Sequence, residues 1–421
     1  MELTKKIFRL KAEATIAVWL PALAGRVVVA CLAAVTLLSA QTQTGPVRIG
    51  FLTPLSGANA QNGRDILNGF VLALEEAGYR AGGRELQLIV EDDEAIPAVG
   101  LTKARKLVEG DRVHFMAGAL LSSTGYALAP YIHSMKIPMI YPVVSADDLT
   151  QRTRSPWIIR TGWTGSQPNH PFGEYAYHAM RLRTVATIAL DYAFGWEAVG
   201  GFKRTFEAQG GRVTRQLWTP LSVHDFAPYL ASIPRNVDAV YALFLGRTAL
   251  QFLRQYQEYG LKDRIPLIGQ GTTTDEHVLP AMGDEAIGAV TVLHYSAALE
   301  TPANQKFSAA YRSRFKRVPS YYSDGGYTSG KWALAAVDAL QGRVEDRNVL
   351  LDAMRKAKPA DLPRGPVELD EYGNPIENIY VRRVERVNGQ LQNTVIQTFP
   401  RVSQFWTYTP ADYLREPLYA R

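Results

Sequence analysis

The sequence predicts an α/β protein of two lobes, each a mostly parallel β-sheet covered by helices. Short apolar runs alternate with amphipathic stretches from about residue 46 onward, and the same alternation restarts near residue 185. Strands that alternate with helices are joined by right-handed crossovers, so they form a mostly parallel sheet. The chain has 421 residues, 47% of them hydrophobic and 20% charged, which is enough for two cores.

The first α/β unit begins with an apolar run that predicts a buried strand. This strand ends in a turn-rich segment, and a helix with Leu67, Phe70, Val71 and Leu74 on one face follows. A second strand leads to an acidic cluster, and a Ser/Thr loop follows the third. The predicted strands of this unit cover residues 47–52, 86–90, 113–117 and 139–141.

The second unit repeats this order and is followed by a shorter C-terminal third. Its predicted strands cover residues 185–190, 237–244, 266–269 and 290–295. Helices are expected around 303–316 and 326–341, and two last strands over 379–384 and 391–397 flank the hairpin turn Asn388-Gly389. Two strands cannot form a domain, so we predict that the chain crosses between the lobes more than once.

The first 40 residues have the pattern of a secretory signal peptide. A basic start between Lys5 and Lys11 precedes an uncharged apolar run from Val27 to Ala40, and a polar segment follows. The apolar run is shorter than the about 20 residues that a membrane-spanning helix needs. We therefore predict export with cleavage near Ala40, with lipid attachment at Cys31 as the alternative.

Several classes of function find little support in the sequence. The net charge is +6, half of it lies in the first 40 residues, and no block of like charges predicts a nucleic-acid partner. The seven histidines lack metal-ligand spacing, and no Gly-x-Ser-x-Gly motif indicates a hydrolase. The run Gly325 to Lys331 matches most of a phosphate-binding loop, but Trp332 stands where Ser or Thr is required. We interpret it as a closely packed helix and predict no cofactor, no metal and no enzyme activity.

Segments spread over residues 46–421 resemble the type I periplasmic binding proteins of ABC importers, in the leucine/isoleucine/valine-binding family. Among them are VRIGFLTPLSG, GRDILNGFVLALEEAG, GALLSSTG, IPMIYPVVSADDLT and DYAFGWEAVGGFKRTFEAQGGRV. The resemblance implies two Rossmann-like lobes joined by a multi-strand hinge, with the ligand in the interlobe cleft. It implies a periplasmic location, ABC permease subunits as partners, and a signal given by the closed lobes. The expected lobe boundaries are 46–163 plus 296–372 for lobe I and 164–295 plus 373–421 for lobe II.

The same resemblance implies a set of ligand-binding residues at the carboxyl ends of the strands, where open α/β sheets bind ligands. From the first lobe it implies Gln61, Leu121, Ser122, Val143, Val144 and Ser145. From the second lobe and the crossover it implies Tyr192, Phe194, Phe244, Gly271, Thr272 and Tyr322. Family members hold a ligand carboxylate with hydroxyls and backbone amides, and here Ser122 and Ser145 are the expected donors.

One departure from the family pattern narrows the expected ligand. Amino-acid-binding members carry an acidic residue after the strand over 266–269, where it pairs with the ligand ammonium. Here no acid occurs until Asp275. We therefore expect a carboxylate without an α-amino group, an aromatic acid such as a hydroxybenzoate or hydroxycinnamate, because Tyr192, Phe194 and Phe244 suit a ring. Branched-chain amino acid or amide binding, and a role as a ligand sensor for a signalling partner, are the alternatives.

Each candidate residue also has a plainer interpretation. Ser122 and Ser145 precede helical segments, where hydroxyls commonly cap the backbone. Phe194 and Phe244 are apolar aromatics, for which core packing is the usual role. Asp275 and Glu276 are typical of charges that start a helix.

Overall fold

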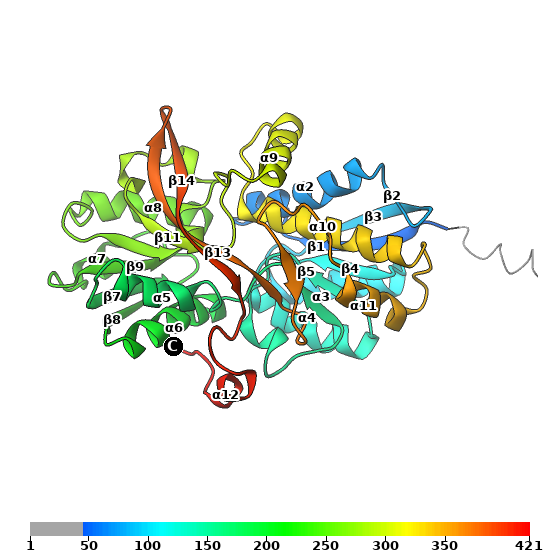
Figure 1. Ribbon diagram of the computed structural model, residues 1–421, viewed down its shortest axis with the longest axis horizontal. Helices are drawn as coiled ribbons and strands as arrows, with labels where there is room; N and C mark the ends of the chain where they lie inside the picture. The colour runs from blue at the N-terminus through cyan, green and yellow to red at the C-terminus, as the bar shows by residue number, and fades with distance from the viewer. Residues whose placement is uncertain (1–44) are drawn as a thin grey trace, which may run out of the picture. The chain divides into compact units, whose positions relative to one another are not determined.

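The computed structural model describes residues 45–421 (Figure 1). The predicted signal peptide, residues 1–40, and Cys31 lie outside the described residues. The segment Val47–Arg421 forms one compact unit that contains two β-sheets. Within the described residues, no helix combines the length and the apolar character needed to cross a membrane.

The first sheet has the strand order β2-β3-β1-β4-β5-β6. Its strands pair in parallel, except that the short β2 runs antiparallel to β3. The strands β4 and β5 are buried along their whole length, as expected for a parallel sheet covered on both faces. The strands are β1 (Val47–Thr53), β2 (Arg80–Ala81), β3 (Arg84–Asp92), β4 (Phe115–Gly118), β5 (Met139–Tyr141) and β6 (Ile158–Arg160).

Helices from two separate parts of the chain cover this sheet. The early ones are α2 (Ala60–Glu76), α3 (Pro97–Arg105) and α4 (Ser122–Met135), and the late ones are α9 (Pro302–Phe315), α10 (Tyr321–Ala339) and α11 (Arg347–Lys356). Figure 1 shows α10 lying along α2. A methyl group added at Gly326 would overlap the carbonyl oxygen of Ile66 on α2. The run Gly325 to Lys331 is therefore part of a closely packed helix, as the sequence predicted.

The second sheet has the order β12-β13-β11-β10-β9-β7-β8, with β14 paired to β13. The strands from β8 to β11 are parallel, and β12, β13 and β14 are antiparallel to their neighbours. They are β7 (Thr184–Leu190), β8 (Arg212–Thr219), β9 (Ala239–Leu243), β10 (Leu267–Gln270), β11 (Val290–Leu293), β12 (Val367–Leu369), β13 (Pro375–Val387) and β14 (Gln390–Val402). The accompanying helices are α5 (Asn169–His178), α6 (Ala193–Ala208), α7 (Ala227–Ala231), α8 (Gly246–Glu258) and α12 (Pro410–Arg415).

The chain passes between the two sheets three times, after β6, after β11 and before β12. At one crossing the backbone N–H of Arg160 donates a 2.8 Å hydrogen bond to the carbonyl of Gly373, which ties the end of β6 to the turn before β13. The predicted hairpin at Asn388-Gly389 joins β13 and β14. The exact lobe boundaries remain a prediction, and β12, which falls in the range 296–372 expected for lobe I, pairs with β13 of the second sheet.

Candidate ligand-binding site

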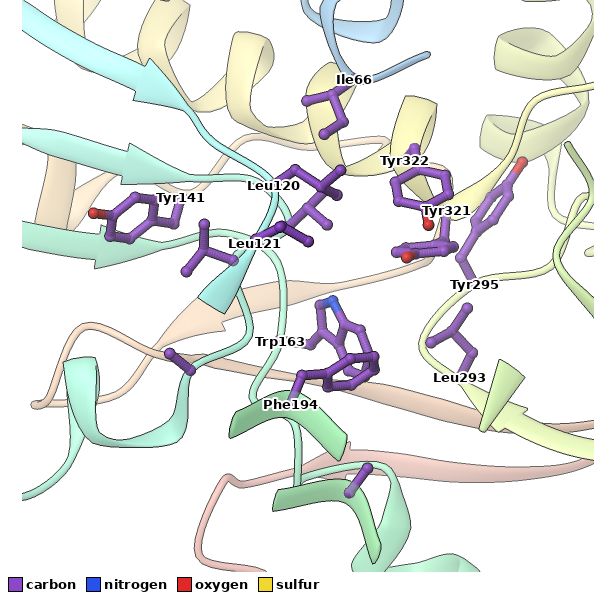
Figure 2. Packing of buried hydrophobic residues seen from close by; sticks show 14 of the residues in the cluster. Ile66, Leu120, Leu121, Tyr141, Trp163, Phe194, Leu293, Tyr295, Tyr321 and Tyr322 are labelled. Carbon is purple, nitrogen blue, oxygen red and sulfur yellow. The ribbon is translucent and has the colours of Figure 1, made fainter. Parts of the chain in front are cut away.

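Loops from both lobes enclose a small cavity at the carboxyl ends of the strands. Its volume is about 10 Å³, about the space of one water molecule, so the loops of the two lobes lie close together here. The loops follow β4, β5, β6, β7 and β9, and α10 contributes its first residue. The lining residues are Leu120, Leu121, Ser122, Val143, Ser145, Trp163, Tyr192, Phe194, Leu245 and Tyr321. Figure 2 shows several of these side chains between the two sheets.

Two buried hydroxyls meet on the first-lobe side of the cavity. Ser122 Oγ lies 3.5 Å from Ser145 Oγ. Ser122 is the first residue of α4, and neither this helix nor the short turn after Ser145 has a side-chain cap hydrogen bond. The interpretation of these two serines as helix caps is therefore wrong. The first N–H groups of a helix lack intrahelical partners and carry a partial positive charge. These amides and the two hydroxyls can therefore donate hydrogen bonds to an anion.

An aromatic wall faces these hydroxyls. The rings of Trp163 and Phe194 lie 5.2 Å apart at 84°, and those of Tyr192 and Phe194 lie 5.9 Å apart at 79°. Tyr321 packs edge-on against Trp163 with ring centres 6.0 Å apart. Burial raises the pKa of Tyr192 well above its usual value, so its hydroxyl stays neutral. This edge-to-face arrangement is the one that aromatic rings prefer.

Six of the twelve expected residues line the cavity: Leu121, Ser122, Val143, Ser145, Tyr192 and Phe194. Of the others, Gln61 is half-buried and donates to Asp65 on its own helix. Its neighbour Asn62 turns inward instead, and its amide donates a 2.7 Å hydrogen bond to the hydroxyl of Tyr322. Tyr322 thus lies behind Tyr321 rather than in the lining. The ligand-binding role of all twelve residues remains a prediction.

The remaining expected residues lie deeper in the protein. Phe244 packs against Phe226 and Phe252, with ring centres 5.0 and 4.5 Å away, so it is a core residue. Val144 is fully buried, and Gly271 and Thr272 form a short helical turn after β10. The carbonyl of Gly271 accepts a hydrogen bond from Arg382 at 2.8 Å, which holds this turn against β13.

No acidic residue is part of the described cavity lining. The acids that follow β10 have partners of their own. Asp275 Oδ2 lies 2.5 Å from Nδ1 of His277, and Glu276 lies 3.6 Å from the guanidinium of Arg382. Asp275 follows a turn and does not begin a helix of its own, but its Oδ1 accepts the backbone N–H of Tyr321, the first residue of α10, at 3.4 Å. Among residues 45–421 no group of three or more His, Cys, Asp or Glu side chains is placed to hold a metal ion.

Sequence reasoning missed Trp163, Tyr321, Leu120, Leu245 and Asn62. Trp163 follows β6, a strand of three residues that is too short to give a clear periodic pattern. Tyr321 and Asn62 are each next to a residue that was expected. A loop residue and its neighbour differ only in which way the backbone turns, and the local sequence carries no signal for that.

A family model described as periplasmic binding protein matches residues 46–390. The chain belongs to the periplasmic binding protein family. It is 35% identical to an ABC transporter substrate-binding protein from Sphaerobacter thermophilus, with a TM-score of 0.81 over 86% of this chain and 99% of that one. It is 33% identical to a solute-binding protein of an ABC transporter from Rhodopseudomonas palustris in complex with 3,4-dihydroxybenzoic acid, with a TM-score of 0.81 over 85% and 98%.

A curated relative of this periplasmic binding protein is the Leu/Ile/Val-binding protein homolog 6 of Brucella melitensis, 29% identical over 89% of this chain and 97% of that protein. These matches confirm the predicted family and the two-lobed α/β fold. The periplasmic binding protein is thus a substrate-binding component of an ABC transporter, and its family consists of binding proteins and not of enzymes.

Proposed function

We propose that this periplasmic binding protein captures a small aromatic carboxylate and delivers it to its ABC permease. The observation that carries the proposal is the composition of the cavity. Two buried hydroxyls, one at the start of α4 and one in the loop after β5, line the cavity together with a wall of aromatic rings, and no charged side chain takes part in the described lining. A molecule with one acidic end and one flat apolar end matches both faces.

The hydroxyl side suits a carboxylate. Ser122 and Ser145 are only 2% and 4% exposed, so a group bound there is removed from water. Hydrogen bonds to a charged acceptor contribute about 1.5–3 kcal/mol each, and the start of α4 adds a favourable dipole. A carboxylate can therefore be held without a basic residue.

The described lining of the cavity has no carboxylate that could pair with an α-ammonium group. A buried ammonium needs a carboxylate or several acceptors, because an unpaired buried charge costs many kcal/mol. Asp275 and Glu276 are engaged with His277 and Arg382, and neither lines the cavity. The dihydroxybenzoate bound by the Rhodopseudomonas relative supports an acid without an amino group. The name of the Brucella relative makes a branched-chain amino acid the second candidate.

Loops of both lobes line one cavity, which supports binding by hinge closure. In such a mechanism the ligand is enclosed between the lobes, and the closed form is the one that the permease recognises. The predicted signal peptide supports export to the periplasm, where this docking takes place.

Isothermal titration calorimetry on the mature protein tests the proposal. Benzoate, 4-hydroxybenzoate and 4-coumarate are compared with leucine and with benzamide, which keeps the ring but lacks the charge. We expect at least one acid to bind, benzamide to bind at least about tenfold more weakly, as expected from the loss of a charged hydrogen-bonded group, and leucine to give no heat. Tight leucine binding without a response to any aromatic acid would overturn the proposal.

A further inference from the structure

Trp163 has a hydrogen-bond donor that nothing in the described protein satisfies. The side chain is 1% exposed, and its indole Nε1 has no partner among the described residues. An indole N–H donates and never accepts, and leaving such a donor unmet in the interior is unfavourable. Figure 2 shows the indole nitrogen on the edge of the ring that faces Leu121 and Tyr321, which both line the cavity. An acceptor atom of the ligand could therefore satisfy this donor.

The surroundings of Trp163 place this donor at the aromatic end of the cavity. Its ring lies 5.2 Å from Phe194, 5.4 Å from His294 and 6.0 Å from Tyr321. These neighbours come from α6, from the end of β11 and from α10. None belongs to the loops that carry Ser122 and Ser145, so a ligand can meet the indole N–H with a polar atom other than its carboxylate.

The charges near Trp163 favour a neutral acceptor. His294 is fully buried, and burial lowers its pKa well below the usual value, so the imidazole is uncharged. Arg364, the cation beyond it, lies 2.5 Å from Asp324 and 3.0 Å from Glu377, so two carboxylates already compensate its charge. Arg382, the other cation near His294, lies 3.6 Å from Glu276. Among the described residues, a second carboxylate of the ligand would therefore meet no cation at this end that lacks a carboxylate partner. A ring hydroxyl oxygen is uncharged and needs no cation.

We propose that the indole N–H of Trp163 binds an oxygen substituent on the aromatic ring of the ligand, which makes Trp163 the residue that selects hydroxybenzoates over unsubstituted benzoate. The inference rests on the proposed function, since it requires an aromatic acid whose carboxylate is held by Ser122 and Ser145. The inference extends the proposed function because it names the hydrogen-bond donor for the ring substituent.

The test is Trp163→Phe, which keeps an aromatic ring and removes the donor together with the second ring of the indole. Calorimetry compares benzoate, 3-hydroxybenzoate, 4-hydroxybenzoate and 4-methylbenzoate, the last having a substituent of similar size that cannot accept a hydrogen bond. We expect the variant to bind at least one of the two hydroxybenzoates about tenfold more weakly than the unaltered protein does. Its affinities for benzoate and 4-methylbenzoate should change less than about twofold. Trp196→Phe is the matched control, because the Trp196 indole already donates to Asp191 at 2.9 Å and does not line the cavity.

An equal loss of affinity for all four acids would show that the indole N–H binds the carboxylate, and no loss of affinity would show that it binds only water. Either result would overturn the inference. Failure of the unaltered protein to bind any aromatic acid would instead overturn the proposed function. If Trp163→Phe does not fold, the indole ¹H–¹⁵N resonances of the unaltered protein replace it. One indole signal should move strongly with a hydroxybenzoate and little with 4-methylbenzoate, and identical spectra with both would overturn the inference.

Discussion

The hydroxyl of Tyr126 on α4 donates a 3.1 Å hydrogen bond to Oε1 of Glu197 on α6, so a helix of the first lobe and a helix of the second meet at one buried carboxyl. The same oxygen accepts the backbone N–H of Asp147 at 3.0 Å. Oε2 of Glu197 has no partner among the described residues. Burial raises the pKa of Glu197 well above its usual value, and burial also raises the pKa of Asp147 to about 6. Contact between the lobes at this point is therefore linked to proton binding.

This linkage predicts how Glu197→Gln changes stability with pH. A carboxyl with a raised pKa in the folded state stabilises the protein fully below its unfolded pKa, about 4.5, and that contribution is lost as pH rises through the folded pKa. Glutamine stays neutral and can accept the same two hydrogen bonds. We expect the variant to match the unaltered protein near pH 4.5 and to have a higher Tm at pH 8, as measured by thermal denaturation over that range. Glu258→Gln, at an exposed site on α8, is the control. Parallel Tm curves for the two proteins would contradict the linkage.

Removing a hydroxyl from the proposed carboxylate site should weaken ligand binding. Ser145→Ala and Ser122→Ala each remove one donor from the pair that is 3.5 Å apart. We expect each to reduce the binding free energy of an aromatic acid by about 1–3 kcal/mol, measured by calorimetry. Ser134→Ala is the matched control, because this exposed serine of α4 bonds only to the carbonyl of Tyr131. An unchanged Kd in Ser145→Ala would remove that residue from the site.

Phe194 and Phe244 should respond differently to truncation. Phe194→Ala removes a ring of the cavity wall, and we expect aromatic acids to bind about 0.5–1.5 kcal/mol more weakly. Phe244→Ala leaves a void beside Phe226 and Phe252, so the free energy of unfolding should fall by about 3–5 kcal/mol. The Kd of its folded fraction should stay the same. Denaturant titration and calorimetry separate the two effects, and a lower affinity without lost stability in Phe244→Ala would refute the assignment.

Close contact between α2 and α10 makes Gly326 sensitive to any side chain. An added methyl would overlap the carbonyl oxygen of Ile66, so Gly326→Ala should reduce the free energy of unfolding by about 1–3 kcal/mol. Gly110→Ala is the control, because there a methyl meets only the side chain of Lys106. Denaturant unfolding measures both variants. Equal stabilities would show that the helices separate at little cost.

Much of the architecture follows from local sequence. Apolar runs over 47–52, 185–190 and 290–295 fall on β1, β7 and β11, and the Asn388-Gly389 turn joins β13 to β14. Strand periodicity and turn chemistry depend on adjacent residues, so they can be read along the chain. The strand β8 escaped prediction because it is a largely exposed strand at one end of the sheet order whose sequence, RVTRQLWT, is mostly polar.

Patterns along the chain were enough to predict the α/β class, the family and the loops that meet at the strand ends. Tertiary packing selected which of two neighbouring side chains points inward. Asn62, and not Gln61, is buried against Tyr322, Tyr321 lines the cavity and Tyr322 does not, and Phe244 packs in the core. Tertiary packing also brought Trp163 beside Phe194 across the two lobes. The physical reason is that the direction of a loop side chain is fixed by packing against residues far away in the chain, and no local pattern encodes those partners.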